Sequence, residues 1–186
     1  QAIADASLEA LAADRVTVFR YVAETQELQV GGAAGLGSSL YHIGQRLPAA
    51  GTAALESLEQ RRPRLLGGID GGKPPDTEAG RLLFQSMPVQ GLVVWPIIHE
   101  DTWLGALGAS YCDTQRVDPL VMSLGETVAN HAAVAIFSAD LHDRTVQRAR
   151  ELEAINGIGR AVASGQSTEA VLREIADTTR QALGAD

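Results

Sequence analysis

The stretch that most constrains the fold of this chain is residues 118–164, in which almost nothing breaks a helix before the pair Gly157 and Gly159. An average helix in a globular protein has ~11–12 residues, so a helix of this length extends past a small domain that it covers. We therefore predict that it leaves its own domain and pairs with another chain. The alternative is a long helix that folds back onto its own domain.

Two faces of this predicted helix differ in composition. The first is a stripe of mostly small residues, suited to lying flat on a sheet: Leu124, Val128, Ala132, Ala135 and Ala139. The second repeats in steps of four and three, as a coiled coil does: Val134, Ser138, Leu141, Thr145, Arg148, Leu152, Ile155, Gly159 and Val162. Thr145 and Arg148 weaken the middle of this second row. The predicted dimer contacts are its apolar members Leu141, Leu152, Ile155 and Val162.

Two β-hairpins precede the long helix. β-Branched and aromatic residues dominate RVTVFRYV (15–22), which predicts a strand. ELQVGGAA (27–34) is its predicted hairpin partner across the turn AETQ. GLVVWPIIH (91–99) and WLGALGASY (103–111) flank the turn EDT and give the strongest strand pattern in the chain. The nearly continuous apolar runs of this second hairpin indicate a central position with both faces covered.

The remaining segments predict shorter elements. Residues 1–13 favour a helix, and a second helix has Gly51 or Thr52 at its start and Pro63 after its end. After it come a short strand candidate, a loop and a short helix, at 63–68, 67–76 and 77–87.

The two ends of the chain resemble each other. DTTRQALGAD (177–186) agrees with DASLEALAAD (5–14) at five of ten positions. This repeat predicts a domain at 1–140, a coiled-coil-like linker helix at 141–164, and at 165–186 the first helix of a following domain of the same kind.

Composition narrows the functional classes. The formal net charge of −8 argues against a nucleic-acid partner, which needs basic patches. The single cysteine, Cys112, cannot form an internal disulfide, which fits a reducing compartment and predicts a cytoplasmic location. No apolar run approaches the ~20 residues of a membrane span, so we predict no membrane contact.

The order of helix, hairpin, helical lid, second hairpin and long exit helix resembles a GAF domain. The resemblance covers roughly residues 5–145 and is carried by DRVTVFRY (14–21), GQRLPAAGTAALESLEQRRPRLL (44–66) and the stretch from GLVVWPIIH to LGETVANHAAVAIFSADL (91–141). It implies an α+β fold with a central antiparallel sheet, terminal helices on one face, lid helices and loops over a pocket on the other, and a long exit helix. It also implies a ligand-binding and dimerising module of a signalling protein.

The sequence contains few of the residue patterns that catalysis, metal binding or cofactor binding require. Cys112 has no histidine in a recognisable partner motif, and His42, His99, His131 and His142 lack metal-ligand spacing. We therefore predict no intrinsic enzyme activity, no metal and no cofactor. Haem is held by some GAF sensors, but core or surface histidines are the simpler interpretation here. The pocket helix lacks the cysteine that holds bilin in the phytochrome-like branch, and the cyclic-nucleotide pattern is incomplete around Phe84.

A pocket for an unknown small molecule remains. Its predicted lining comes from residues 40–56 and 77–87 together with one face of the second hairpin: Tyr41, Arg46, Leu55, Arg81, Phe84, Trp95 and Trp103. Strand alternation puts Val93, Trp95 and Ile97 on one face and Leu92, Val94 and Pro96 on the other, without saying which set meets the pocket. Tryptophan and arginine suit a planar or anionic molecule.

These observations predict a small-molecule-sensing module of a bacterial signal-transduction protein, dimeric through its long helices. The expected output is a sensor histidine kinase. The alternative is a dimerisation or spacer domain that binds no ligand, in a transcription activator, a cyclase or phosphodiesterase, or a phosphatase.

Overall fold

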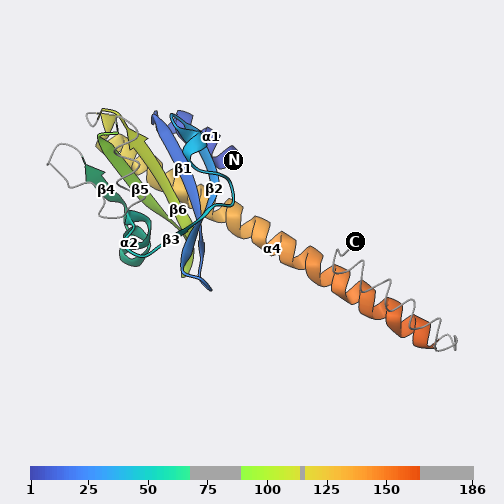
Figure 1. Ribbon diagram of the computed structural model, residues 1–186. Coiled ribbons are helices and arrows are strands. Elements are labelled where there is room, and N and C mark those ends of the chain that lie inside the picture. The colour runs from blue at the N-terminus through green and yellow to red at the C-terminus, as the bar shows by residue number, and fades with distance from the viewer. Residues whose placement is uncertain (68–88, 114–115, 164–186) are drawn as a thin grey trace. The chain divides into compact units, whose positions relative to one another are not determined.

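The computed structural model describes residues 1–67, 89–113 and 116–163, with side chains up to Arg160. Arg81 and Phe84, the predicted loop 67–76 after Gly67, the predicted helix 77–87 and the proposed start of a second domain lie outside these residues, as does the side chain of Val162. In chain order the elements are α1 (Ala2–Ala10), β1 (Arg15–Val22), β2 (Glu27–Gly35), the 3-10 helix η1 (Ser38–Leu40), β3 (Arg46–Pro48), α2 (Ala53–Gln60), β4 (Arg64–Gly67), β5 (Gly91–His99), β6 (Thr102–Tyr111) and α4 (Pro119–Ala163) (Figure 1).

The six strands form one antiparallel sheet in the order β3-β2-β1-β6-β5-β4. Both predicted hairpins are confirmed, and β1 spans the predicted residues 15–22. Because β6 lies between β1 and β5, the strongly apolar second hairpin occupies the middle of the sheet, as its sequence predicted. Between β2 and α2 the chain forms η1 and the short edge strand β3.

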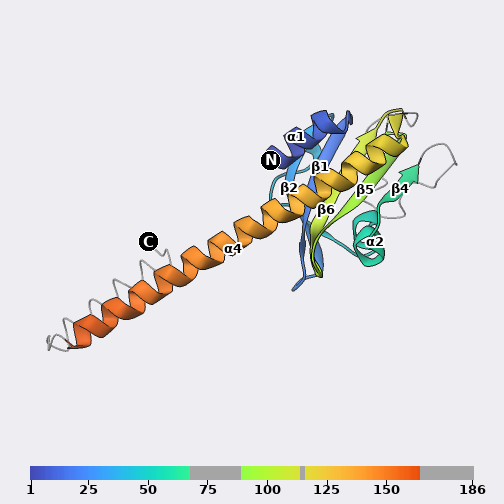
Figure 2. The ribbon, with the colours of Figure 1, turned by 180° about the vertical axis from the view of Figure 1, so that it is seen from behind.

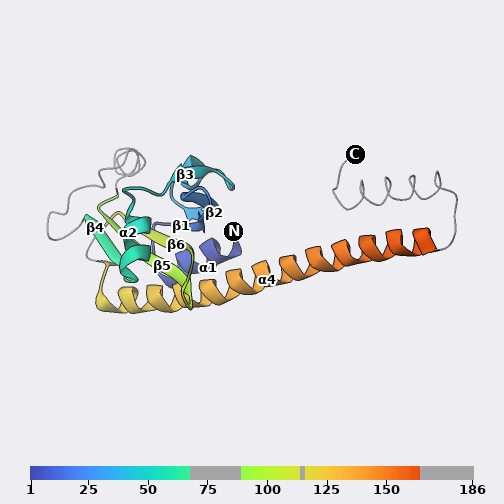
Figure 3. The same ribbon diagram turned by 90° about the horizontal axis from the view of Figure 1, so that it is seen from below.

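Each face of the sheet has its own apolar cluster. On one face, α1 and the first part of α4 cover a core that includes Val16, Val18 and Trp95 (Figure 2). On the other, α2 packs over a smaller cluster that includes Leu28 and Val94 (Figure 3). The GAF-like α+β arrangement expected from the sequence is therefore present.

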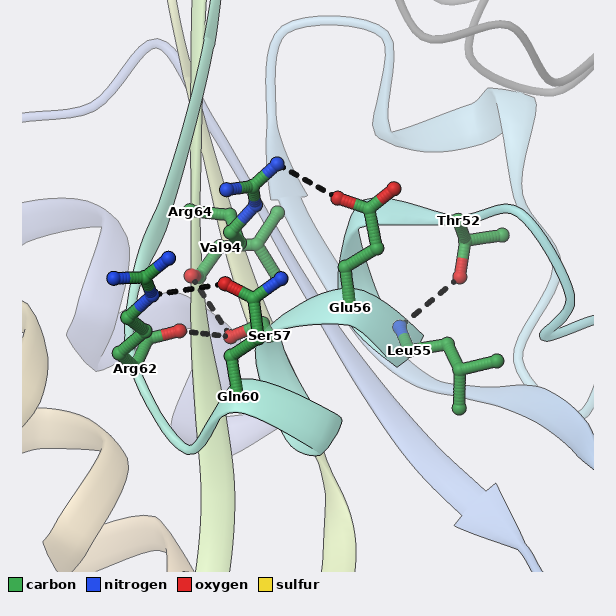
Figure 4. Close-up of polar contacts among 8 residues, drawn as sticks. All are labelled: Thr52, Leu55, Glu56, Ser57, Gln60, Arg62, Arg64 and Val94. Atoms are coloured by element: carbon green, nitrogen blue, oxygen red, sulfur yellow. Dashed lines mark hydrogen bonds and ion pairs between the residues drawn. The ribbon is translucent and has the colours of Figure 1, made fainter.

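Helix α2 is fixed at its start and along its length by side-chain hydrogen bonds (Figure 4). Thr52 caps it, since its Oγ1 accepts a hydrogen bond from the backbone N–H of Leu55 at 3.2 Å. The buried hydroxyl of Ser57 reaches the carbonyl of Arg62 at 2.9 Å and that of Val94 at 3.2 Å. The bond from Ser57 to Val94 holds α2 against β5.

The face of α4 that packs on the sheet differs from the predicted stripe. Val128 and Ala132 contact the core, but Leu124, Ala135 and Ala139 are exposed. The helix residues that pack against the core are Val121, Met122, Gly125, Val128, Ala129, Ala132, Ala133 and Ile136. The prediction favoured small residues, whereas the position of the Trp95 ring beneath Gly125 sets the rotation of the helix.

The chain divides into two compact units, and the second begins at Ser138, within α4. In this second unit, three of the predicted dimer contacts are exposed: Leu141 at 56%, Leu152 at 60% and Ile155 at 63%. Within Pro119–Arg160, α4 has a window of mean hydropathy 1.4, long and apolar enough to cross a bilayer by length and composition alone. A helix that packs in the core of a soluble domain has the same property, and Ala129, Ala132 and Ala133 pack in this core.

Candidate functional site

Three buried polar side chains gather on the sheet face opposite α1 and α4. They are Arg15, Thr17 and Ser110, which are 1%, 5% and 3% exposed. Arg15 is the one charged side chain among the buried residues of the described chain. Burying a charge is costly unless polar groups surround it. Apolar packing therefore does not explain why a charged side chain occupies this buried position.

Strand alternation and register bring these residues together. Val16 and Val18 point into the core under the helices, so Arg15 and Thr17 point to the other face. Arg15 lies directly opposite Ser110 of β6, and Thr17 lies opposite Gly108. Ser110 in turn lies opposite Leu92 of β5. The three polar side chains thus form a floor with glycine beside it.

Tyr41 lies over this floor. The guanidinium carbon of Arg15 is 4.6 Å from the centre of the Tyr41 ring, and Arg15 Nε donates to Thr17 Oγ1 at 3.3 Å. The ring of Phe19 meets that of Tyr41 edge-on at 6.1 Å. We call Arg15, Thr17, Ser110 and Tyr41 the Arg15 patch.

The Arg15 patch has an apolar margin. Val89 is buried, and Tyr41 and Leu92 pack against it. Burial lowers the pKa of Arg15, and its contact with Tyr41 partly opposes this. Burial likewise raises the pKa of Tyr41, which the charge of Arg15 partly offsets. At neutral pH the patch therefore presents a guanidinium cation under a neutral phenol.

The predicted ligand residues that the structure describes do not share one site. Tyr41 belongs to the Arg15 patch, and Leu55 packs in the smaller cluster under α2. Two others lie apart from the patch: Arg46, on the edge strand β3, pairs with Glu27 at 3.3 Å, and Trp103 meets Tyr21 edge-on at 5.7 Å.

Trp95 is not part of a site on this face. It is fully buried on the opposite face, where its indole Nε1 donates to the carbonyl of Met122 at 3.0 Å. The structure thus shows which β5 side chains lie on each face of the sheet. Leu92 and Val94 pack on the same face as the Arg15 patch, and Trp95 packs on the other.

The sequence analysis missed Arg15, Thr17 and Ser110. The alternation in RVTVFRYV could have revealed Arg15 and Thr17. Arg15, Thr17 and Phe19 lie on one face of this strand, and Val16 and Val18 lie on the other. Arginine is rarely found at a buried position, so an arginine on a strand face that also carries Thr17 and Phe19 is unusual. Ser110 had no comparable signal, because its role depends on the register between β1 and β6.

Asp14, the residue before Arg15, joins the start of β1 to the segment that leads into α4. Its carboxylate accepts a hydrogen bond from the backbone N–H of Cys112 at 2.7 Å and from Arg116 Nη1 at 2.8 Å. Arg116 also donates to the carbonyl of Ala12. Just beyond, Asp118 caps α4 by accepting from the N–H of Val121 at 2.8 Å. The Arg15 patch and the segment before α4 are thus linked through the adjacent residues Asp14 and Arg15.

We expect Asp14→Ala to lower the free energy of unfolding by about 1–2 kcal/mol near neutral pH, and Asp14→Asn to cost less, because asparagine keeps an acceptor for Cys112. Burial raises the pKa of Asp14, but the Cys112 and Arg116 hydrogen bonds outweigh it and the pKa lies below 3.8. The stabilisation is therefore complete above the pKa of unfolded aspartate and is lost as the pH falls through the lower folded value. Urea unfolding between pH 7 and pH 3 measures this, and equal pH slopes for wild type and Asp14→Asn would contradict it.

The described residues offer no evident metal site, since none of their His, Cys, Asp and Glu side chains form a group of three placed to hold an ion. Cys112 lies just after β6, and burial followed by the charge of Asp14 raises the pKa of its thiol. A thiol with a raised pKa is a weak nucleophile at neutral pH.

Comparison with known proteins identifies the class. The family model described as GAF domain matches residues 1–136, so this chain belongs to the GAF domain family. GAF domains are regulatory modules, typically soluble and cytoplasmic, and the chain is thereby a sensory module of signal transduction. A search by sequence against curated proteins finds no match.

Solved structures share the fold. The GAF-B domain of DevS from Mycobacterium smegmatis is 23% identical, with a TM-score of 0.59, over 77% of this chain and 94% of that one. The GAF domain of a phosphoenolpyruvate-protein phosphotransferase from Coxiella burnetii is 23% identical, with a TM-score of 0.63, over 76% of this chain and 82% of that one. The GAF domain of a two-component sensor histidine kinase from Bacillus halodurans is 18% identical, with a TM-score of 0.63, over 76% of this chain and 96% of that one.

Proposed function

We propose that this chain is a small-molecule-sensing input module of a bacterial signal-transduction protein, cytoplasmic and dimeric through α4, with a sensor histidine kinase as its output. The observation that carries the sensing role is the Arg15 patch. A spacer domain gains nothing from a buried cation, since a well-packed apolar group in its place is often neutral or stabilising. The similar structure from Coxiella burnetii belongs to a phosphoenolpyruvate-protein phosphotransferase, which keeps other signalling outputs as alternatives.

The route for a signal follows from adjacent residues. Arg15 belongs to the patch, and its neighbour Asp14 accepts hydrogen bonds from Cys112 and Arg116 in the segment just before α4. A ligand that shifts Arg15 displaces Asp14 with it, because one peptide bond joins them. The start of α4 then moves relative to the sheet, and paired helices carry that movement onward as a small rotation or change of register.

Dimerisation is supported by the exposed apolar row on α4. Leu152 and Ile155 are both more than half exposed and occupy the two apolar positions of one heptad. A second copy of this helix presents the same row, which fits the two-fold symmetry of most homodimers.

We expect Leu152→Asp combined with Ile155→Asp to give monomers with an intact sheet, because two carboxylates would be buried in the apolar seam. Light scattering measures the mass, and circular dichroism checks the fold. Gln147→Asp combined with Ala154→Asp is the control, since it adds the same charges away from the row. A double aspartate variant that remains dimeric would exclude this seam.

A thermal-shift screen with a broad set of metabolites tests the sensing role. A ligand that binds the folded domain raises its stability by about 2.7 kcal/mol at a concentration of about 100 times Kd. We expect at least one compound to raise the melting temperature in a saturable way. If none does, the spacer alternative is favoured.

A further inference from the structure

We propose that the outward face of α4 over residues 120–134 docks onto the same face of a second copy of this chain, and that protonation of His131 in this seam separates the two copies. This rests on the dimerisation proposed above, and it adds the part of the domain that takes part and the condition that controls it. The inference comes from the spacing of exposed residues, the hydrogen bonds of two threonines and the chemistry of histidine.

A row of exposed residues follows the outward face of α4 within the first compact unit. Its members recur in steps of four and three: Leu120, Leu124, Thr127, His131 and Val134. The three apolar members are 65%, 38% and 55% exposed in chain order. With ~3.6 residues per turn, this row lies on the side of the helix opposite Ala129 and Ala132, which pack in the core. The described part of the chain therefore leaves these apolar side chains open to solvent.

A second copy of the same helix is the partner that this row fits. Apolar residues spaced in steps of four and three form the seam of a two-stranded coiled coil, which a helix with the same repeat complements. The row predicted from residue 134 to residue 162 has this spacing too, and Val134 belongs to both rows. In the sequence, one repeat thus runs from residue 120 to residue 162 without a break in its spacing.

The two threonines of this repeat have their hydroxyls satisfied within the helix. Thr127 Oγ1 donates to the carbonyl of Ser123 at 3.1 Å. Thr145 Oγ1 donates to the carbonyl of Leu141 at 2.8 Å. Burying a hydroxyl costs much less when it already has a hydrogen-bond partner. Both threonines can therefore enter an apolar seam without leaving an unpaired donor.

His131 is the one ionisable residue of the row between residues 120 and 134. Its neighbours one turn away on the helix are all uncharged: Thr127, Val128, Val134 and Ala135. The sheet packs on the other side of α4, so none of its charged groups faces this histidine. His99 of β5 also contacts α4, but it stacks on Phe137, with the ring centres 4.1 Å apart. No charge of the described domain thus offsets a proton on His131.

Protonation changes what two facing histidines can do. In a parallel two-fold pair of helices, each residue of the seam meets its own counterpart. A neutral imidazole has one donor and one acceptor, so two of them can hydrogen-bond to each other. Two imidazolium rings have donors only, and they repel each other where water is excluded. Association is therefore complete above the ordinary histidine pKa of about 6.5 and decreases as the pH falls below it.

The overall charge of the chain favours the opposite trend. The formal net charge is −8 with every histidine neutral, so two copies repel each other at long range. Protonation of the histidines outside the row, His42, His99 and His142, reduces this repulsion. A dimer that weakens on acidification therefore points to a histidine inside the seam.

Sedimentation equilibrium of the whole chain at constant ionic strength measures the Kd of the dimer at pH 7.5 and pH 5.5. If both imidazoles must be neutral in the dimer, Kd rises by up to about 100-fold over this range, and we expect at least about tenfold. His131→Gln should associate at both pH values, with a change of less than about threefold. His142→Gln, on the same helix but outside the row, is the matched control and should keep the full pH effect.

His131→Lys places a fixed cation in the seam. At pH 7.5 it should associate as weakly as the wild type does at pH 5.5. Glu126→Gln makes the same change of net charge at an exposed position outside the row, and should not weaken association. Circular dichroism checks that each variant keeps its fold.

Three outcomes would overturn the assignment of His131 while leaving dimerisation in place: a wild-type Kd that does not rise on acidification, a pH effect that survives in His131→Gln, or unchanged association of His131→Lys. A chain that is monomeric at both pH values would instead contradict the dimerisation proposed above, and the seam with it.

Discussion

Replacing Gly105 with alanine is expected to destabilise the domain by about 3 kcal/mol or more, and so to lower its melting temperature by about 10 °C. Gly105 lies in β6, between Arg20 of β1 and Ile97 of β5. An added Cβ would be 1.9 Å from the carbonyl oxygen of Phe19 and 2.9 Å from its carbonyl carbon. Both are backbone atoms in the middle of the sheet, so no side-chain rotation can relieve the clash.

Gly108 provides the matched control on the same strand. A Cβ there would be 3.7 Å from the carbonyl oxygen of Thr17 and 3.8 Å from Leu92 Cδ1, which are ordinary contacts. We therefore expect Gly108→Ala to change the free energy of unfolding by less than about 1 kcal/mol. Urea unfolding followed by circular dichroism compares the two variants. Equal effects would mean that strand glycines here act through backbone entropy rather than through contact.

The sheet could be predicted from the sequence because local patterns determine it. In β1 and β2 the apolar and polar residues alternate around a short polar turn, and in β5 and β6 the apolar runs are continuous. Thr52 and Pro63 likewise mark the limits of α2 by local rules of capping and backbone geometry.

The Arg15 patch could not be predicted in the same way. Its members come from β1, β6 and the segment after η1, and they meet only through strand register and loop placement. Alternation separates the two faces of β5 but does not say which face a helix covers. Two large aromatic residues therefore looked equally suited to a pocket, although Trp95 packs under α4 and Tyr41 over Arg15.

The rotation of α4 was predicted incorrectly for a related reason. A stripe of small residues indicates close approach, but several overlapping stripes exist along an alanine-rich helix. The choice among them depends on the shape of the opposing surface, and here the large Trp95 ring requires the residue above it to lack a side chain. This makes Gly125 the position at which sheet and helix are matched.

Gly125→Ala is accordingly expected to destabilise the domain by about 2–4 kcal/mol, against the usual preference of helices for alanine. Its Cβ would lie 2.0 Å from Trp95 Cε2 and 2.2 Å from Cζ2. The indole cannot turn aside freely, because it is fully buried and hydrogen-bonded to the carbonyl of Met122. The helix must instead lift from the sheet or the ring must leave its place. Thermal unfolding measures the loss.

Gly157→Ala is the control in the same helix, with no described atom within 4 Å of the added Cβ. It should stabilise α4 by about 0.5–1 kcal/mol through helix propensity alone, so the two glycine substitutions have opposite signs.

A double-mutant cycle with Trp95→Leu isolates the contact between ring and helix. If the indole causes the clash, Gly125→Ala should cost little once Trp95 is replaced, with an interaction energy of about 2 kcal/mol or more. Additive effects would show that Gly125 is required for another reason. A large interaction would identify the surface on which α4 must slide or tilt if changes at the Arg15 patch are to reach the helix. Trp95 is hydrogen-bonded to Met122 near the start of α4, and Asp14 holds Cys112 and Arg116 in the segment just before it.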